Sequence, residues 1–197
     1  KNVPPLLNAA ADYVRDRKID TQKYDFYWTD DTEHSLHQRV IIPCVWEGKI
    51  IGYTSRAFVD GVKPKYYSQY EPNFVFNLNN QTYDNKFVIV CEGPFDAMAI
   101  DGVAIMSNDC NDIQASIIDK LDREVIVVPD ADKAGAQLIK RAIENGWSVS
   151  FPVWQETCKD INEAVVKYGK LFVLKSILDA RESSRLKIEL MRKRLHV

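Results

Sequence analysis

The chain has 197 residues, of which 46% are hydrophobic, so it can bury a core as one large domain or two small ones. Its 26 lysines and arginines are balanced by 28 aspartates and glutamates, and the formal net charge of -2 excludes a strongly basic protein. This balance does not exclude an enzyme of nucleic acids, because a basic groove and an acidic metal site on one molecule would cancel.

The sequence also limits the compartment and the kind of site. The four cysteines (Cys44, Cys91, Cys110, Cys158) have no CxxC spacing, which argues against a zinc site or a disulfide framework and fits a reducing compartment such as the cytoplasm. Neither a membrane-spanning run nor a signal peptide is recognisable, so we expect no membrane partner. Because the first residue is Lys1 rather than Met, we expect a fragment or trimmed form of a longer protein.

The first half of the chain predicts a small α+β region. Residues 4–18 predict a helix that begins at two prolines and ends in cations. Residues 20–38 show no clear period. The apolar runs 40–46 and 49–58, separated by a Glu-Gly pair, predict a β-hairpin, and residues 60–85 are expected to form loops.

The second half alternates between strand and helix patterns. Strands are predicted at residues 87–91, 103–106, 124–128 and 148–154, with helices after Pro94 and at residues 111–121 and 133–145. This alternation predicts an α/β fold with a mostly parallel sheet covered by helices. Residues 161–195 predict two further helices that break near Gly169, the second rich in Arg and Lys.

Three acidic signatures follow the predicted strands: EGPFD at 92–96, DAD at 130–132 and KDINE at 159–163. The carboxyl ends of strands in an open α/β sheet line one crevice, and clustered carboxylates need a cation to stay ionised. Taken singly, Asp96 and Asp160 are explained as helix caps and the DAD triplet as a turn. Together, the three signatures predict a divalent-metal site for phosphodiester chemistry.

The ordered set EGxxD, DxDxxG and KDxNE resembles the Toprim domain of primases, topoisomerases and related nucleases. The resemblance covers residues 84–165, under half of the chain, and its carriers are Glu92, Gly93, Asp96, Asp130, Asp132, Gly135 and Asp160. It implies a site that uses Mg²⁺, or Mn²⁺ in its place. In that site the catalytic residues would be Glu92, Asp130 and Asp132, and the metal would be held by Glu92, Asp96, Asp130, Asp132 and Asp160.

The residues upstream of position 84 narrow the resemblance to one group of Toprim proteins. The segments 39–43 (RVIIP), 52–56 (GYTSR) and 63–66 (KPKY) look like the region before Toprim in bacterial and phage DnaG-type primases. This implies that Arg56, Lys63 and Lys65 bind the nucleotide or the template, a role that suits cations. The nearby aromatics could stack on single-stranded bases, although packing into a core is the commoner role; they are Tyr66, Tyr67, Tyr70, Phe74 and Phe76.

The resemblance as a whole implies the catalytic core of a DNA primase. Such a core synthesises short RNA primers from NTPs on single-stranded DNA. The segment 158–163 (CKDINE) is similar to phage primase–helicases, which implies a replicative helicase as partner. Asn162 stands where bacterial primases usually carry a second Asp, which removes one charge, and a zinc-binding module has no counterpart.

We therefore expect an N-terminal α+β primase-core subdomain at residues 1–83, a Toprim domain at 84–165 and a helical segment at 166–197. Two other functions remain open. A Toprim nuclease would use the same acids to cleave rather than join, and the basic segment upstream argues against it. A non-catalytic Toprim module would only bind DNA, and its acids would be expected to be degraded, whereas here they are intact.

Overall fold

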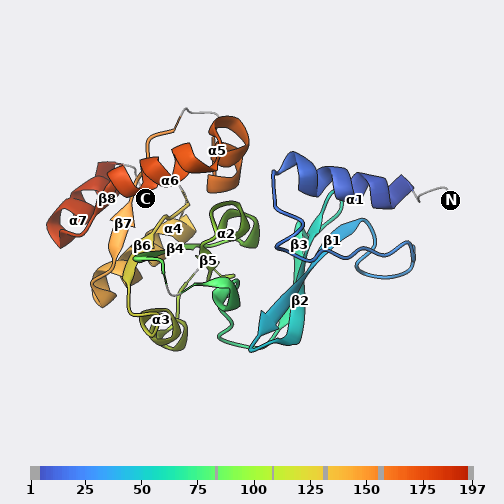
Figure 1. Ribbon diagram of the computed structural model, residues 1–197, viewed down its shortest axis with the longest axis horizontal. Helices are drawn as coiled ribbons and strands as arrows, with labels where there is room; N and C mark the ends of the chain where they lie inside the picture. The colour runs from blue at the N-terminus through green and yellow to red at the C-terminus, as the bar shows by residue number, and fades with distance from the viewer. Residues whose placement is uncertain (1–4, 83, 108, 131–132, 155–157, 195–197) are drawn as a thin grey trace. The chain divides into compact units, whose positions relative to one another are not determined.

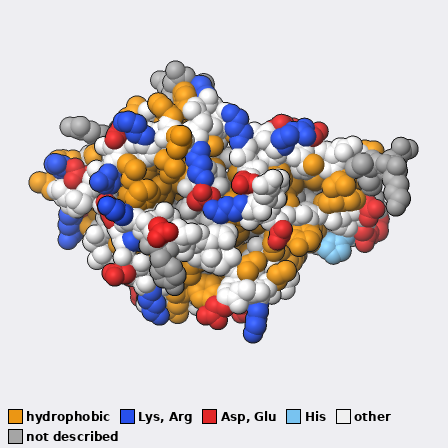
Figure 2. Space-filling model, viewed as in Figure 1, with side chains coloured by type: hydrophobic (Ala, Val, Ile, Leu, Met, Phe, Trp, Pro, Cys, Tyr) orange, Lys and Arg blue, Asp and Glu red, His pale blue; other side chains and the backbone are white. Residues whose placement is uncertain are grey.

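The structure is a computed structural model that describes residues 5–82, 84–107, 109–130, 133–154 and 158–194. The chain forms two compact units, Lys1–Pro72 and Asn73–Val197, each with its own sheet (Figure 1). None of the helices among the described residues is long and apolar enough to cross a membrane. On the face shown in Figure 2, positive and negative side chains are interspersed.

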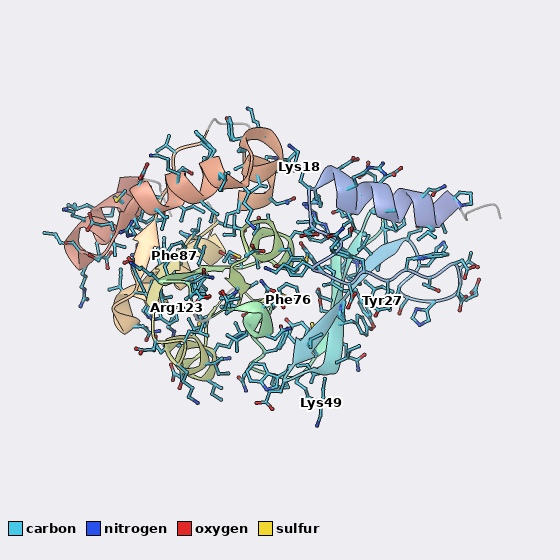
Figure 3. The ribbon with its side chains drawn as sticks, in the orientation of Figure 1. Lys18, Tyr27, Lys49, Phe76, Phe87 and Arg123 are labelled. Atoms are coloured by element: carbon cyan, nitrogen blue, oxygen red, sulfur yellow. The ribbon has the colours of Figure 1, made fainter. Side chains whose placement is uncertain are left out.

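The first unit packs helix α1 (Pro5–Asp16) on an antiparallel sheet of order β1-β2-β3. The strands are β1 (Arg39–Trp46), β2 (Lys49–Ala57) and β3 (Tyr66–Tyr70). The predicted hairpin is confirmed. β3 lies in a region expected to be loop, because its run of exposed polar and tyrosine side chains lacks the alternation of a half-buried strand. Tyr27, labelled in Figure 3, exchanges two backbone hydrogen bonds with Ile41, both of 2.8 Å.

The second unit is built on a sheet of order β5-β4-β6-β7-β8. The strands β4 (Phe87–Cys91), β5 (Val103–Ala104), β6 (Glu124–Val127) and β7 (Ser148–Ser150) run parallel, while β8 (Arg181–Glu182) is antiparallel to β7. Strands β4, β6 and β7 are almost entirely buried, as expected for parallel strands covered on both faces. The predicted α/β fold with a mostly parallel sheet is therefore confirmed.

Helices cover both faces of this sheet. They are α2 (Pro94–Ile100), α3 (Asp112–Asp119), α4 (Lys133–Asn145), α5 (Ile161–Tyr168), α6 (Lys170–Asp179) and α7 (Arg185–Arg194), and a short 3-10 turn, η1, spans Leu78–Asn80. Ile118, Leu138 and Ile188 bring α3, α4 and α7 to one hydrophobic core, whereas α2, α5 and α6 contact one another. Figure 1 shows α5 and α6 on the side of the sheet opposite α3.

The region after Gly169 contains β8 and two helices, not the single helix that the sequence predicted. The chain turns after β8, where the Ser184 N–H donates 2.8 Å to Oε1 of Glu182. β8 is only two residues long and pairs at the sheet edge, so its sequence carries no strand pattern of its own. Long-range pairing with β7 creates this element.

The register of β4 against β6 fixes where the strands end. Phe87 pairs with Glu124 and Val90 pairs with Val127, so both strands begin at one edge of the sheet and finish at the other. Figure 3 labels Phe87 and Arg123 near the edge where these strands begin. The residues that follow β4 and β6 therefore share the opposite edge.

Residues 74–76 belong to the second unit. Phe76 and Ala104 exchange backbone hydrogen bonds of 2.8 and 3.2 Å. Gln114, only 4% exposed, donates from Nε2 to the carbonyls of Phe74 and Ile105, each at 2.9 Å. The compact units consequently divide after Pro72, earlier than the expected boundary at residue 83, and residues 166–194 fold within the second unit.

We predict that Gln114→Ala destabilises the second unit by about 2–4 kcal/mol, because two buried carbonyls lose their donor. The measurement is the free energy of unfolding from urea denaturation. The control is Ser116→Ala, an exposed position on the same helix, which should change stability by less than about 0.5 kcal/mol. Equal stabilities for the two variants would contradict the assignment of residues 74–76 to this unit.

Candidate functional site

The first two acidic signatures meet at the carboxyl edge of β4 and β6. Pairing continues past the strands, since the Val128 N–H donates to the Val90 carbonyl at 2.9 Å. Beyond it, Oε1 of Glu92 accepts a hydrogen bond of 3.4 Å from the backbone N–H of Asp130. The parallel register therefore brings these two carboxylate residues together although 38 positions separate them in sequence.

The third signature joins the first through the start of α5. Asp96 lies in the first turn of α2, is 9% exposed, and its Oδ1 accepts a hydrogen bond of 2.8 Å from the Asn162 N–H. Asp160 caps α5, because its Oδ1 accepts from the Glu163 N–H at 2.7 Å. Asp160 is thus a helix cap, as its isolated motif suggests. It begins the same helix whose Asn162 N–H binds Asp96 of the first signature.

The buried thiol of Cys91 lies at the end of β4, next to the first acidic signature. Burial raises the pKa of Cys91 well above its usual value, and the negative charges of Asp96, Asp130, Glu92 and Asp160 each raise that pKa further. These influences agree with the hydrogen bonds that join the three signatures beyond the end of β4. Cys91 ends β4, and its Sγ contacts the carbonyl oxygens of Gly93 (3.6 Å) and Val103 (3.3 Å).

Two glycines in the signatures make room for the acids. A Cβ on Gly135 would lie 2.0 Å from the carbonyl oxygen of Asp130, so any side chain there would displace the Asp130 backbone. A Cβ on Gly93 would lie 3.2 Å from Oδ2 of Asp96, tighter than most real contacts. The glycines at these spacings therefore serve the positions of the two aspartates rather than general chain flexibility.

The donor set at this edge suits magnesium, because Mg²⁺ and Ca²⁺ take oxygen ligands and the converging groups are carboxylates. Within the described ranges, however, no group of three or more His, Cys, Asp or Glu side chains is close enough to hold an ion. Asp132, predicted as a ligand and catalytic residue, lies outside the described residues. The described carboxylates Asp96 and Asp160 each direct an oxygen to the backbone of α5.

The predicted basic residues gather at one end of β2 and β3 in the first unit. Arg56 pairs with Tyr66 across the strands, and its guanidinium carbon lies 4.5 Å from the centre of that ring. The Lys65 carbonyl accepts from the Ala57 N–H at 3.0 Å, while the side chains of Lys63 and Lys65 are exposed. In the part of the chain that the structure describes, none of these three cations forms an ion pair with a carboxylate.

The five aromatics divide between the two roles considered for them. Tyr66 and Tyr67 are 36% and 40% exposed on β3, and the Arg56 guanidinium covers one face of the Tyr66 ring. Phe74 and Phe76 are buried in the second unit and pack edge to face, with ring centres 6.4 Å apart. Tyr70 is partly buried at the end of β3.

Arg39 is a residue to which the sequence assigned no separate role. It begins β1, is 3% exposed and donates to the carbonyl of Pro64 between Lys63 and Lys65. The signal was available in the sequence, since a charged residue opens an otherwise apolar run that forms a half-buried strand.

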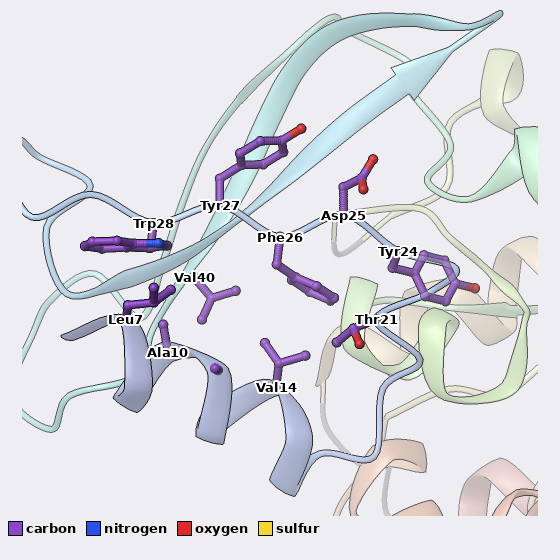
Figure 4. A pocket seen from close by; sticks show the side chains of 11 residues that line it. Leu7, Ala10, Val14, Thr21, Tyr24, Asp25, Phe26, Tyr27, Trp28 and Val40 are labelled. Carbon is purple, nitrogen blue, oxygen red and sulfur yellow. The ribbon is translucent and has the colours of Figure 1, made fainter. Parts of the chain in front are cut away.

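A separate cavity in the first unit does not coincide with any predicted site. It has a volume of about 320 Å³ and is bounded by α1, residues 21–28 and Val40. Figure 4 shows Phe26 directed toward Val14 across this space. Its lining contains none of the basic or acidic residues predicted for the site, so it takes no part in the chemistry considered below.

Comparison with known proteins agrees with this geometry. Residues 89–165 match the family described as Toprim-like. The chain is 25% identical over 152 residues to a DNA primase of Aquifex aeolicus (strain VF5), which covers 68% of this chain but only 30% of that protein. The chain therefore spans about a third of the length of this curated relative.

Solved structures share the fold. The zinc-binding and RNA polymerase domains of Aquifex aeolicus primase superpose with a TM-score of 0.71 at 20% identity, over 90% of this chain and 60% of that one. A DnaG primase catalytic domain bound to single-stranded DNA gives a TM-score of 0.69 at 16% identity, over 90% and 73% of the two chains. The chain thus has the fold of DnaG-type primase catalytic cores, with a Toprim-like domain, as its motifs predicted.

We predict that Gly135→Ala destabilises the second unit by about 1–3 kcal/mol, because the new methyl group collides with the Asp130 backbone. An ordinary helical Gly→Ala change would instead stabilise by up to about 1 kcal/mol. The free energy of unfolding, measured by urea denaturation, shows whether the change destabilises or stabilises the protein. The control is Gln137→Ala, an exposed position on α4 that should be nearly neutral, and a stabilised Gly135→Ala protein would refute the close approach.

Proposed function

We propose that this chain is the catalytic core of a DNA primase, which synthesises short RNA primers on single-stranded DNA by metal-dependent nucleotidyl transfer. The observation that carries the proposal is the pair of hydrogen bonds that join the three signatures at the carboxyl edge of the sheet, from the Asp130 N–H to Glu92 and from the Asn162 N–H to Asp96. Similarity to a curated DNA primase and the shared fold of primase catalytic cores support this choice among the reactions of Toprim proteins.

Glu92, Asp130 and Asp132 would hold Mg²⁺, or Mn²⁺ in its place, and Glu92 is also the candidate proton acceptor. A metal here would neutralise the charge of the transferring phosphoryl group and lower the pKa of the attacking 3′-hydroxyl. Asp96 and Asp160 would add negative charge to the site while they hold the start of α5 in place.

Asn162 limits what the third signature can give to a metal. The signature supplies Asp160, but two positions later it has a neutral Asn162 instead of a second aspartate. The Asn162 side chain is buried, and its backbone N–H donates to Asp96. The metal would then depend mainly on the first two signatures. This leaves fewer charges at the edge than a chain with an aspartate at this position would have.

Arg56, Lys63 and Lys65 would bind the triphosphate of an incoming NTP or the phosphates of the template. These cations have no carboxylate partner within the described residues, so a polyanion would satisfy them. The exposed Tyr67 offers a ring on which a base could stack. Single-stranded DNA and NTPs are the partners that this chemistry requires. The resemblance of residues 158–163 to phage primase–helicases adds a replicative helicase, in the cytoplasm, as a further proposed partner.

The proposal predicts that Asp130→Asn abolishes primer synthesis, with a loss of at least roughly 100-fold, because a metal ligand is replaced by a neutral group. The protein is incubated with single-stranded DNA, labelled NTPs and Mg²⁺, and the products are separated by length. Short RNA is the expected product of the unchanged protein. Asp122→Asn, an exposed site at the opposite edge of the sheet where φ is 52°, should retain activity.

Each other outcome has a distinct meaning. Normal dinucleotide formation by Asp130→Asn would show that the acidic edge is not the catalytic site. Shortened DNA in place of RNA would indicate a nuclease. A mobility shift of the DNA without any new product would indicate a binding module.

A further inference from the structure

Arg39 is a buried cation in the first unit. It is 3% exposed, and burial lowers the pKa of its guanidinium below the usual value, with Tyr67 acting in the opposite direction. Arginine nevertheless stays charged in proteins. A buried charge is unfavourable unless hydrogen bonds or an opposite charge compensate it, so the surroundings of Arg39 indicate what it does.

The compensation that Arg39 receives comes from one loop. Its Nη2 donates to the Pro64 carbonyl at 2.6 Å and its Nη1 is 3.4 Å from the Lys65 carbonyl. Its guanidinium carbon lies 6.0 Å from the centre of the Tyr67 ring, on the strand that follows this loop. No carboxylate pairs with Arg39 among the residues that the structure describes, and its Nε has no hydrogen-bond partner there.

The loop end that Arg39 holds is also tied to β2. The Lys65 carbonyl accepts a hydrogen bond from the Ala57 N–H at 3.0 Å, and Ala57 is the residue that pairs with Arg39 across β1 and β2. Hydrogen bonds from Arg39 and Ala57 therefore hold the backbone carbonyls of residues 64–65. The side chains of Lys63 and Lys65, on either side of Pro64, remain exposed to solvent.

We infer that Arg39 is a positioning residue that fixes the loop from which Lys63 and Lys65 bind phosphate groups. The identity of those phosphates, in an NTP or in template DNA, rests on the function proposed above, whereas the loop contact does not. Arg39 also adds a positive charge without a counter-ion beneath the loop, and this charge strengthens the attraction for a phosphate. It does not itself touch the ligand.

The fork of the guanidinium distinguishes this role from simple packing. Two carbonyls of neighbouring residues accept from two different nitrogens of Arg39, a geometry that a lysine ammonium cannot reproduce at once. A residue that only filled space would be replaced without loss by a side chain of similar length. The conservative change Arg39→Lys therefore separates the two roles, because it keeps the charge and removes the fork.

The test uses Arg39→Gln and Arg39→Lys in the whole chain, with Arg15→Gln as a control for loss of a cation on exposed α1. The rate of trypsin cleavage after Lys65 measures how often the loop opens, because cleavage there requires local opening of the backbone. Trypsin does not cleave after Lys63, because Pro64 follows it. Fluorescence anisotropy with labelled ATP and with a labelled single-stranded DNA oligonucleotide then shows which phosphate the loop binds.

We expect Arg39→Gln to raise the rate of cleavage after Lys65 about tenfold and to weaken binding of one or both ligands about tenfold, with cooperative unfolding retained. Arg39→Lys should show most of the loss in cleavage protection, and Arg15→Gln should behave as the unchanged protein. If Arg39→Gln fails to fold, Arg39→Lys alone decides.

Cleavage and binding by Arg39→Lys equal to those of the unchanged protein would overturn the inference. The same holds for a folded Arg39→Gln protein with unaltered protection of Lys65. If the unchanged protein bound neither ATP nor DNA, the proposed function would fail on its own, while the cleavage result would still confirm or overturn the loop contact.

Discussion

The parallel pairing of β4 with β6 is the constraint on which the candidate site depends. It sets Glu92 and Asp130 at one edge of the sheet, where like charges would repel unless something compensates them. The backbone supplies part of that compensation: the N–H groups of Asp130, Asn162 and Glu163 donate to Glu92, Asp96 and Asp160. Two of these contacts join different signatures, so the sheet and the start of α5 hold the acids together before any metal binds.

Each of the two units, taken by itself, offers one component that the proposed reaction requires. The first presents Arg56, Lys63 and Lys65 without carboxylate partners among its described residues, and Arg39 supports the loop that carries two of them. The second holds carboxylates that hydrogen bonds join at one edge of its sheet, and carboxylates suit a hard divalent cation. Cations that hold a polyphosphate and acids that hold a metal are the two components by which proteins stabilise this reaction.

Local patterns predicted the four parallel strands of the sheet, the hairpin and the acids at the strand ends, because burial of β-branched runs and the position of charges after them are visible along the sequence. The patterns did not predict β3, β8 or the role of Arg39. Each depends on a partner distant in sequence: β3 on its register with β2, β8 on β7, and Arg39 on the carbonyl of Pro64. The division of the compact units after Pro72 also depends on distant partners, since Gln114 and Ala104 bind residues 74–76.

A crystal soaked in Mn²⁺ shows through its anomalous difference map whether the strand-end carboxylates form one metal site. We expect a peak within coordination distance of Glu92 and Asp130, with the hydrogen bond from Asn162 to Asp96 still present. Mn²⁺ bound elsewhere, with no peak at this edge, would show that these carboxylates do not form the metal site.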